Sequence, residues 1–467
     1  MKQVKLFITL IFITNFCFAQ TKKPYQLDSL FTVLYQQNQF NGEVLIAEKG
    51  NIVLKKGYGV SNENTQQLIN ENTLFELASC SKQFTAAAIV LLKREGKLNY
   101  NDKISKYLPE LSFWDDVTIY DLLRHTSGIP DFLGYMPDKW DHNKIASNDD
   151  LIKIYVTNKD TLQFKPKSRH RYSNTNFVLL ATIIERASGK KYADFLSDKI
   201  FKPLNMDRTF VYCRWKNPMK IDNLAIGYIW KTDSFTKTTI VDSESEKTEI
   251  YYFDGIIGTS KVHSNVDDVY KWILALKNNT LFTQKEFDEM TEISKTLEGK
   301  DVKYGFGLDI RKGENKFTFG HTGSWDGYTT FVYHDVIRDR TIIILENFNY
   351  GVNPFNTIFQ ILEGIPLTIE YPKKITLPQS DITQFTGTYI GESGVQHIIT
   401  YKEQHLIYNT AKDIWDMRFF PYSKDQFKGI RQGSADAVLK FTKTDDGRMK
   451  LEMLQNGEIV DFGIREN

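Results

Sequence analysis

The segment that most strongly indicates the fold reads Phe75-Glu76-Leu77-Ala78-Ser79-Cys80-Ser81-Lys82-Gln83-Phe84-Thr85. It runs into an alanine-rich stretch, 84–92, whose apolar residues point in all directions and so predict a buried helix that ends near Gly96. Ser79 and Lys82 stand three residues apart, a spacing that places both side chains on one face of a helix. At the start of such a helix, a neutral lysine can take the proton of an attacking serine.

The same spacing has an ordinary alternative. A serine at the start of a helix often only caps it, and a lysine can extend its charge to solvent. Two other pairs, Ser188 with Lys191 and Ser234 with Lys237, have this spacing, but neither precedes a buried apolar helix. Ser79 and Lys82 are therefore a candidate nucleophile and base, but their spacing alone does not decide between a catalytic pair and a capping serine with a solvent-exposed lysine.

Two further motifs follow in the chain. Tyr172-Ser173-Asn174 is the only Tyr-Xaa-Asn sequence among 24 tyrosines, and it precedes the apolar helical run 177–187. The other motif is His321-Thr322-Gly323-Ser324, which follows the strand-like residues 317–319. Its first three residues are the only place in the sequence where Lys or His is followed by Thr or Ser and then by Gly. Taken singly, Tyr172 would be an ordinary core or surface tyrosine and His321 a turn histidine. Their order after the first motif indicates a common site.

Together these stretches resemble the serine β-lactamase and penicillin-binding-protein superfamily, in its class C-like branch with D,D-peptidases, D-aminopeptidases and family VIII-type esterases. Residues 118–129 and 266–272, the second after the glycine-rich stretch 255–258, are similar to structural segments of that branch. The resemblance covers about residues 25–365. It implies an α/β (α+β) fold of the β-lactamase/transpeptidase type, with an antiparallel sheet flanked by helices and a mostly helical subdomain.

The resemblance also implies a catalytic role for three residues. Ser79 would be the nucleophile that becomes acylated, and Lys82 would be its neighbouring base. Tyr172 would be the second proton-transfer group, serving the leaving group. Since two coupled titrating groups need not have separate roles, Lys82 and Tyr172 are assigned jointly.

The residues implied in substrate binding come from the second and third motifs. Asn174 would hold the lysine and the substrate amide. His321 would line the opposite wall and hydrogen-bond the motif tyrosine or a substrate carboxylate, with Thr322 and Gly323 beside it. The backbone N–H of Ser324 would complete an oxyanion hole with that of the nucleophile.

Departures from the family pattern bear on the substrate. His321 stands where β-lactamases of this branch usually carry lysine, which favours D-amino-acid peptides first, then small esters, then β-lactam-like compounds. The alternative to an active serine hydrolase is a penicillin-binding or sensing module on the same fold that is weakly catalytic or not catalytic. Arg169 and Arg171 are either a solvated surface cluster or positive charges that attract a substrate carboxylate. His125-Thr126-Ser127-Gly128 looks catalytic but is interpreted as a structural turn.

Composition excludes several other functions. The chain has 467 residues, 59 Lys and Arg against 58 Asp and Glu, and a net charge of +1, which argues against nucleic-acid binding. Because it contains no His-Glu-Xaa-Xaa-His, no paired Cys-Xaa-Xaa-Cys and no phosphate-binding glycine loop, no metal or cofactor is expected. Its expected partner is a small-molecule or peptide substrate. No sequence feature addresses the oligomeric state.

The ends of the chain predict export and a second domain. Lys2, Lys5 and the apolar run 6–13 form a signal peptide over residues 1–19, so the protein is expected in the periplasm or outside the cell, without a stable membrane span. The predicted hydrolase domain covers 20–370, followed by a linker, 371–379, that lies in a proline-punctuated stretch. Short alternating runs predict a small all-β domain over 380–467.

Overall fold

The computed structural model describes residues 22–36, 39–231, 236–239, 249–348, 354–365, 375–391, 394–402, 404–410, 417–430, 437–455 and 458–466. The chain divides into two compact units, and the larger one comprises Gly42–Ile229 and Thr238–Asn349. Within the described part of the chain, no helix has the length and apolar character that a membrane crossing requires. The predicted signal peptide, 1–19, lies outside the described residues.

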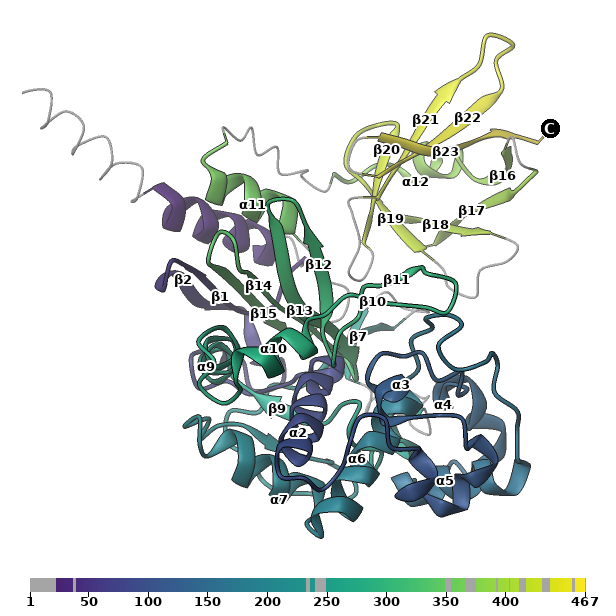
Figure 1. The fold of residues 1–467 in the computed structure, drawn as a ribbon. Helices are drawn as coiled ribbons and strands as arrows, with labels where there is room; N and C mark the ends of the chain where they lie inside the picture. The colour runs from purple at the N-terminus through teal and green to yellow at the C-terminus, as the bar shows by residue number, and fades with distance from the viewer. Residues whose placement is uncertain are drawn as a thin grey trace, which may run out of the picture. The chain divides into compact units, whose positions relative to one another are not determined.

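A six-stranded antiparallel sheet organises the larger unit (Figure 1). Its strands, in spatial order, are β12 (Asp309–Gly313), β13 (Lys316–Trp325), β14 (Tyr328–Asp335), β15 (Arg340–Glu346), β1 (Gly42–Glu48) and β2 (Asn51–Tyr58). β15 is buried along its whole length and β1 along nearly all of it, as their apolar sequences predict. Lys49 and Gly50, with φ of 52° and 76°, form the tight turn that joins β1 to the partly exposed β2. β1 and β2 therefore form an antiparallel hairpin.

Helices account for most of the chain between β5 and β6, which is the predicted helical subdomain (Figure 1). The α-helices of the larger unit are α2 (Lys82–Arg94), α3 (Ile119–Leu123), α4 (Phe132–Tyr135), α5 (Asn148–Asn158), α6 (Asn174–Ser188), α7 (Tyr192–Leu196), α8 (Glu249–Tyr252), α9 (Val266–Lys277) and α10 (Gln284–Met290). Short turns of other helix types are η1 (Ala78–Ser81), η2 (Ile104–Lys106), η3 (Pro109–Trp114), η4 (Pro137–Lys139) and η5 (Ser197–Phe201).

The helix α2 is the centre of this packing. Every residue from Lys82 to Leu92 is buried, and the helix packs against α6 and α7. Lys93 and Arg94 in its last turn complement the negative end of the helix dipole. The alanine-rich sequence explains the close packing, since small side chains let neighbouring helices approach.

Short ladders complete the larger unit, and their strands are β3 (Val60–Asn62), β4 (Gln67–Leu68), β5 (Phe75–Glu76), β6 (Phe210–Val211), β9 (Val262–Ser264), β10 (Ser294–Lys295) and β11 (Asp301–Val302). A two-stranded ladder joins β7 (Tyr228–Lys231) and β8 (Thr236–Thr239). The ladder that matters for the site is β5-β9-β6, because β5 leads directly into the first motif.

The other unit contains a closed antiparallel barrel. Its strands are β16 (Gly387–Gly391), β17 (Gln396–Lys402), β18 (His405–Thr410), β19 (Met417–Pro421), β20 (Gln426–Ile430), β21 (Ala437–Lys443), β22 (Met449–Gln455) and β23 (Glu458–Arg465). Buried aromatic side chains fill its core, and Phe385, just after α12 (Gln379–Thr383), stacks on Phe441 with ring centroids 4.5 Å apart. The prediction of a small C-terminal β domain is confirmed. This unit also holds the helix over 22–36 and α11 (Phe355–Glu363).

Candidate active site

Ser79 lies in a strained turn between β5 and α2. Ala78, immediately before it, has φ of 47°, a left-handed conformation that is unfavourable for a residue with a Cβ atom. Ala78, Cys80 and Ser81 are buried, whereas Ser79 is partly exposed. The turn therefore presents the Ser79 hydroxyl and hides its neighbours.

Neighbouring strands hold this turn from both sides. The Leu77 N–H donates to the carbonyl oxygen of Val262 in β9 (2.8 Å), and the Val262 N–H donates to the Ser81 hydroxyl (3.1 Å). The Thr330 hydroxyl of β14 donates to the Leu77 carbonyl oxygen (2.9 Å). These contacts fix the backbone on both sides of Ser79, so the unfavourable conformation of Ala78 is maintained.

Lys82 is buried beneath the serine rather than extended to solvent. Its Nζ lies 2.9 Å from Ser79 Oγ, 2.9 Å from Asn174 Oδ1 and 3.0 Å from the carbonyl oxygen of Thr259. Burial lowers its pKa from 10.5 to about 7, and the negative charge of Asp131 partly opposes that shift. The ordinary interpretation of the motif, a capping serine and a snorkelling lysine, is wrong, because no serine side chain caps α2 and the lysine is fully enclosed.

The three partners of Lys82 suit a neutral amine. An amide oxygen and a backbone carbonyl can only accept hydrogen bonds, so Asn174 and Thr259 take the two N–H groups of a neutral lysine. The lone pair then faces the Ser79 hydroxyl, which can reverse the bond and donate its proton. This arrangement is that of a base placed against an alcohol.

Asn174 belongs to a chain of polar contacts that the sequence did not reveal. Asp131 accepts hydrogen bonds through Oδ2 from the Asn174 backbone N–H (2.8 Å) and from Asn174 Nδ2 (3.0 Å). The Thr259 hydroxyl donates to Asn174 Oδ1 at 2.7 Å. Asn174 is thereby oriented with its oxygen toward Lys82. The only sequence signal for Asp131 was its place as the N-cap of α4, where it accepts from Leu133 N–H.

Tyr172 forms the side of the site next to Lys82. The Lys82 Nζ lies 5.0 Å from the centroid of its ring. Tyr172 is 36% exposed, yet desolvation raises the pKa of its hydroxyl well above 10, and a hydrogen bond with Ser79 opposes that shift. Tyr172 therefore remains protonated near neutral pH and can donate a hydrogen bond.

His125 supports the tyrosine. Its ring centroid lies 4.2 Å from that of Tyr172. Its Nδ1 lies 3.2 Å from the Ser173 N–H, which donates to it, and 3.1 Å from Asn176 Nδ2. Ser127 Oγ donates to Asn176 Oδ1 (2.7 Å). The His-Thr-Ser-Gly stretch is thus structural in its contacts, although its histidine packs directly against a site residue.

The third motif lies within β13, and its residues alternate between two faces. His321 and Gly323 are buried, whereas Thr322 and Ser324 are exposed. A Cβ atom on Gly323 would lie 2.4 Å from Thr330 Oγ1 and 2.5 Å from the Leu77 carbonyl oxygen, so only glycine lets the strand approach the serine turn this closely. The motif is therefore part of the strand rather than a turn.

The ladder register also sets the direction of the backbone. Trp325 pairs with Tyr328 across a two-residue turn, so alternate residues of β13 bond to β14. Thr322 and Ser324 direct their backbone N–H groups to the opposite side, where the pairing with β12 ends at Gly320. This places the Ser324 amide along the part of β13 that lies past the end of β12.

His321 contacts Tyr304 rather than Tyr172, and its expected bond to a substrate carboxylate stays a prediction. Its Nε2 lies 2.9 Å from the hydroxyl of Tyr304, while its ring centroid is 6.2 Å from that of Tyr172. Burial lowers the pKa of His321, so its imidazole is neutral. Arg169 and Arg171, beside the second motif, are exposed. Among the described residues, no three or more His, Cys, Asp or Glu side chains are grouped to hold a metal ion.

Comparisons with known proteins place this site in a family context. The Beta-lactamase family model matches residues 27–363. Penicillin-binding protein 4* of Bacillus subtilis is 33% identical over 448 residues, which span 94% of this chain and 98% of that protein. Protein flp of Staphylococcus aureus is 28% identical, over 78% of this chain and 70% of that protein.

Two solved structures share the fold. The octameric penicillin-binding protein homologue from Pyrococcus abyssi has a TM-score of 0.63 and 23% identity, over 94% of this chain and 99% of that one. D-amino acid amidase from Ochrobactrum anthropi has a TM-score of 0.59 and 21% identity, over 73% of this chain and 99% of that one. These likenesses confirm the predicted fold class.

Proposed function

The chain belongs to the beta-lactamase family and is a serine hydrolase in kind, and from that premise we propose that it acts through an acyl-enzyme formed on Ser79. The observation that carries the proposal is the 2.9 Å contact between Ser79 Oγ and the buried Nζ of Lys82, whose pKa is lowered to about 7. A base with a pKa near the working pH is the most efficient for proton transfer.

The reaction proceeds in two halves. Ser79 Oγ attacks the substrate carbonyl carbon while its proton passes to the neutral amine of Lys82. The tetrahedral intermediate collapses, the bond to the leaving nitrogen or oxygen breaks, and that atom receives the proton through Lys82 and Tyr172 acting together. Water then attacks the ester carbonyl, gives its proton to the same pair, and releases the acid and the free serine. Asn174 holds Lys82 throughout.

The negative oxygen of the intermediate needs hydrogen-bond donors. We assign this role to the backbone N–H groups of Ser79 and Ser324, and the register of β13, which directs the Ser324 amide away from β14, supports the assignment. Thr322 and Ser324 are the exposed residues of the motif and would contact substrate. A single donor of this kind typically contributes about 3 to 4 kcal/mol to catalysis.

We expect substrates in the order D-amino-acid peptides or amides, small esters, then β-lactams. Both ring nitrogens of His321 have protein partners, Tyr304 and the Thr322 carbonyl oxygen, so this residue offers no cation for the carboxylate that penicillins carry. The fold shared with a D-amino acid amidase supports the same order.

Labelling by a fluorophosphonate or a fluorescent penicillin tests the proposal. The wild type should become labelled and Ser79→Ala should not, with Ser188→Ala, the serine of a pair that has the same spacing to a lysine, as the matched control. Equal labelling of wild type and Ser79→Ala would sink the assignment. Labelling without turnover on D-alanyl peptides, amides or p-nitrophenyl acetate would instead indicate a penicillin-binding or sensing module.

We further propose that the protein is exported to the periplasm or beyond after removal of residues 1–19, and that its domains span 20–370 and 380–467 around the linker 371–379. The charge and apolar pattern of the first twenty residues supports export. N-terminal sequencing of the protein recovered from a cell envelope or culture medium should begin at Gln20. An N-terminus that retains Met1 would contradict it.

A further inference from the structure

Tyr304 stands at the centre of the site's aromatic groups, although it belongs to none of the three motifs. Its ring centroid lies 4.6 Å from that of His125, 5.6 Å from His321 and 6.0 Å from Tyr172. It is only 3% exposed. A tyrosine that touches both the second-motif tyrosine and the third-motif histidine can govern how the two are placed.

The hydrogen bonds of His321 determine which of its nitrogens carries the proton. Nδ1 contacts the carbonyl oxygen of Thr322, which can only accept, so Nδ1 is the protonated nitrogen. Nε2 of the neutral ring is then an acceptor, and the Tyr304 hydroxyl donates to it at 2.9 Å. The hydroxyl proton of Tyr304 thus selects one tautomer and stabilises the uncharged ring.

The segment Tyr304-Gly305-Phe306-Gly307-Leu308 is held tightly in place. A Cβ atom on Gly305 would lie 2.0 Å from the Met290 carbonyl oxygen at the end of α10, and one on Gly307 would lie 2.5 Å from the Lys82 carbonyl oxygen at the start of α2. Gly307 also has φ of 66°. The two glycines let this segment lie against both helices, so Tyr304 has little freedom to move.

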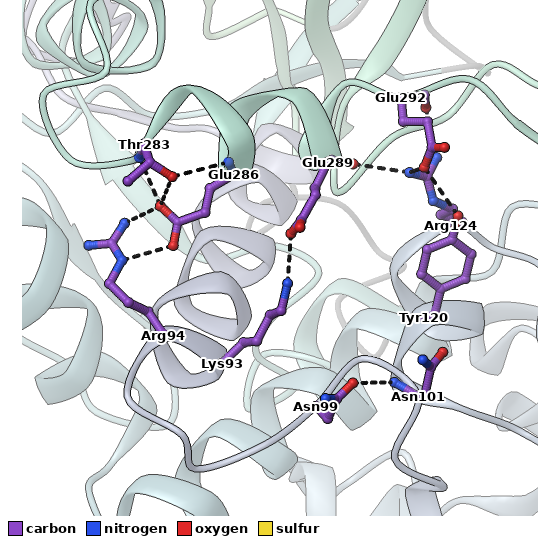
Figure 2. Close-up of polar contacts among 10 residues, drawn as sticks. All are labelled: Lys93, Arg94, Asn99, Asn101, Tyr120, Arg124, Thr283, Glu286, Glu289 and Glu292. Carbon is purple, nitrogen blue, oxygen red and sulfur yellow. Dashed lines mark hydrogen bonds and ion pairs between the residues drawn. The ribbon is translucent and has the colours of Figure 1, made fainter.

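A buried arginine, Arg124, bonds to the same segment and also to Glu289 and Glu292, the last two contacts being drawn in Figure 2. Arg124 is fully buried, and its guanidinium donates to the carbonyl oxygens of Tyr304 (3.3 Å), Glu292 (2.8 Å) and Glu289 (3.0 Å). It also pairs with the Glu292 carboxylate at 3.1 Å. Arg124 therefore connects the stretch 118–129 to the end of α10 and to Tyr304.

Helix α10 is itself attached to α2. Figure 2 shows Lys93 paired with Glu289 (2.8 Å), and Arg94 making two bonds to the Glu286 carboxylate. The positions of α2, α10 and Arg124 are thus coupled, and Tyr304 is held by all three.

We propose that Tyr304 is a positioning residue that keeps His321 neutral and protonated on Nδ1, so that the third motif presents no cation to the substrate. The proposal rests on the function proposed above and deepens it, because it favours substrates whose group beside the scissile carbonyl is uncharged. The charged or titratable groups that act on His321 are Asp309, which favours its protonation, and Lys82, which disfavours it. His125 also acts on His321 electrostatically.

The test is Tyr304→Phe, which removes the hydroxyl and keeps the ring. Nitrogen-15 NMR of the imidazoles in the substrate-free protein should show Nε2 of His321 unprotonated in the wild type. In the variant its pKa should rise by roughly half to one unit, since one neutral hydrogen bond to the uncharged form is lost. Tyr389→Phe is the matched control, because this equally buried tyrosine donates to the Phe385 carbonyl oxygen in the barrel.

Kinetics give a second readout. We compare kcat/KM for a D-alanyl peptide that ends in a free carboxylate with kcat/KM for the same peptide as its amide. In Tyr304→Phe below pH 6, the ratio of the first value to the second should rise about threefold to tenfold, because a protonated His321 attracts the carboxylate. This rise should vanish when His321→Gln is also present. An unchanged His321 titration, or an equal change in the His321→Gln background, would overturn the proposal. The NMR result does not require turnover, so failure of the hydrolase assignment would be recognised separately by the Ser79→Ala labelling.

Discussion

Replacing Asp131 by Asn should shift the pH dependence of the enzyme. Asp131 is connected to Lys82 through one amide: Lys82 Nζ is 2.9 Å from Asn174 Oδ1, and Asn174 Nδ2 is 3.0 Å from Asp131 Oδ2. This path places the two charges roughly 7 Å apart, where Coulomb's law with an effective dielectric constant of about 20 gives about 2 kcal/mol. The substitution keeps the volume and one acceptor oxygen but removes that attraction.

The sign of the shift follows directly. The negative charge of Asp131 favours protonated Lys82, so its removal lowers the pKa of Lys82 from about 7 by about one to two units. Because kcat/KM requires the neutral amine, its rise with pH should move to lower pH by the same amount. Above pH 8 the variant should be slower than the wild type, since a weaker base accepts the serine proton less readily.

The assay is kcat/KM measured from pH 4.5 to 9 on one neutral substrate. Asp150→Asn is the matched control, because this carboxylate also stabilises a helix start, accepting from Ser147, and it does not act on Lys82. An Asp131→Asn profile that stays in place, or moves to higher pH, would refute Lys82 as the titrating group.

Two further predictions concern the serine turn. Gly323→Ala should lower the free energy of unfolding by about 1 to 3 kcal/mol and reduce kcat, because the added methyl group would clash with Thr330 and the Leu77 carbonyl oxygen. Urea denaturation measures the change in the free energy of unfolding, and Gly313→Ala, whose added methyl group would meet no neighbouring atom, is the control. Cys80 should react with iodoacetamide at pH 8 at least about a hundredfold more slowly in the folded than in the unfolded protein, because burial raises the pKa of its thiol to about 12. Fast labelling of the folded protein would contradict the interpretation of Cys80 as a buried packing residue.

The sequence was sufficient for the parts of the fold that have strong local patterns. The apolar run 84–92 predicted α2, because the apolar pattern of a helix acts over a few neighbouring residues. The C-terminal domain was predicted only as a small all-β unit, and its closure into a barrel was not predicted. β23 is exposed over its first three residues, is fully buried at Gly463 alone and has little apolar alternation, so its pairing with β16 and β22 depends on closure of the barrel.

The site was predicted where residues fall in motifs and missed where they come from elsewhere. Asp131, Thr259 and Tyr304 approach the site through the tertiary fold, and nothing in their local sequence indicates polar contacts with the motif residues. His321 shows the same limit. Its residue type was interpreted as a departure from lysine, but its partner, Tyr304, could not be identified without the structure.

The neutrality of Lys82 is the property that connects the fold to the chemistry. Full burial of a lysine can lower its pKa by about 3 to 5 units, and the positive end of α2, which begins at Lys82, acts in the same direction. Asp131 raises the pKa by about 1 to 2 units, which accounts for a final value of about 7 rather than a lower one. Burial without the carboxylate would leave a weak base, and the carboxylate without burial would leave a permanent cation. The alanine-rich helix α2, which buries Lys82, and Asp131, the N-cap of α4, are therefore both required for Ser79 to be activated near neutral pH.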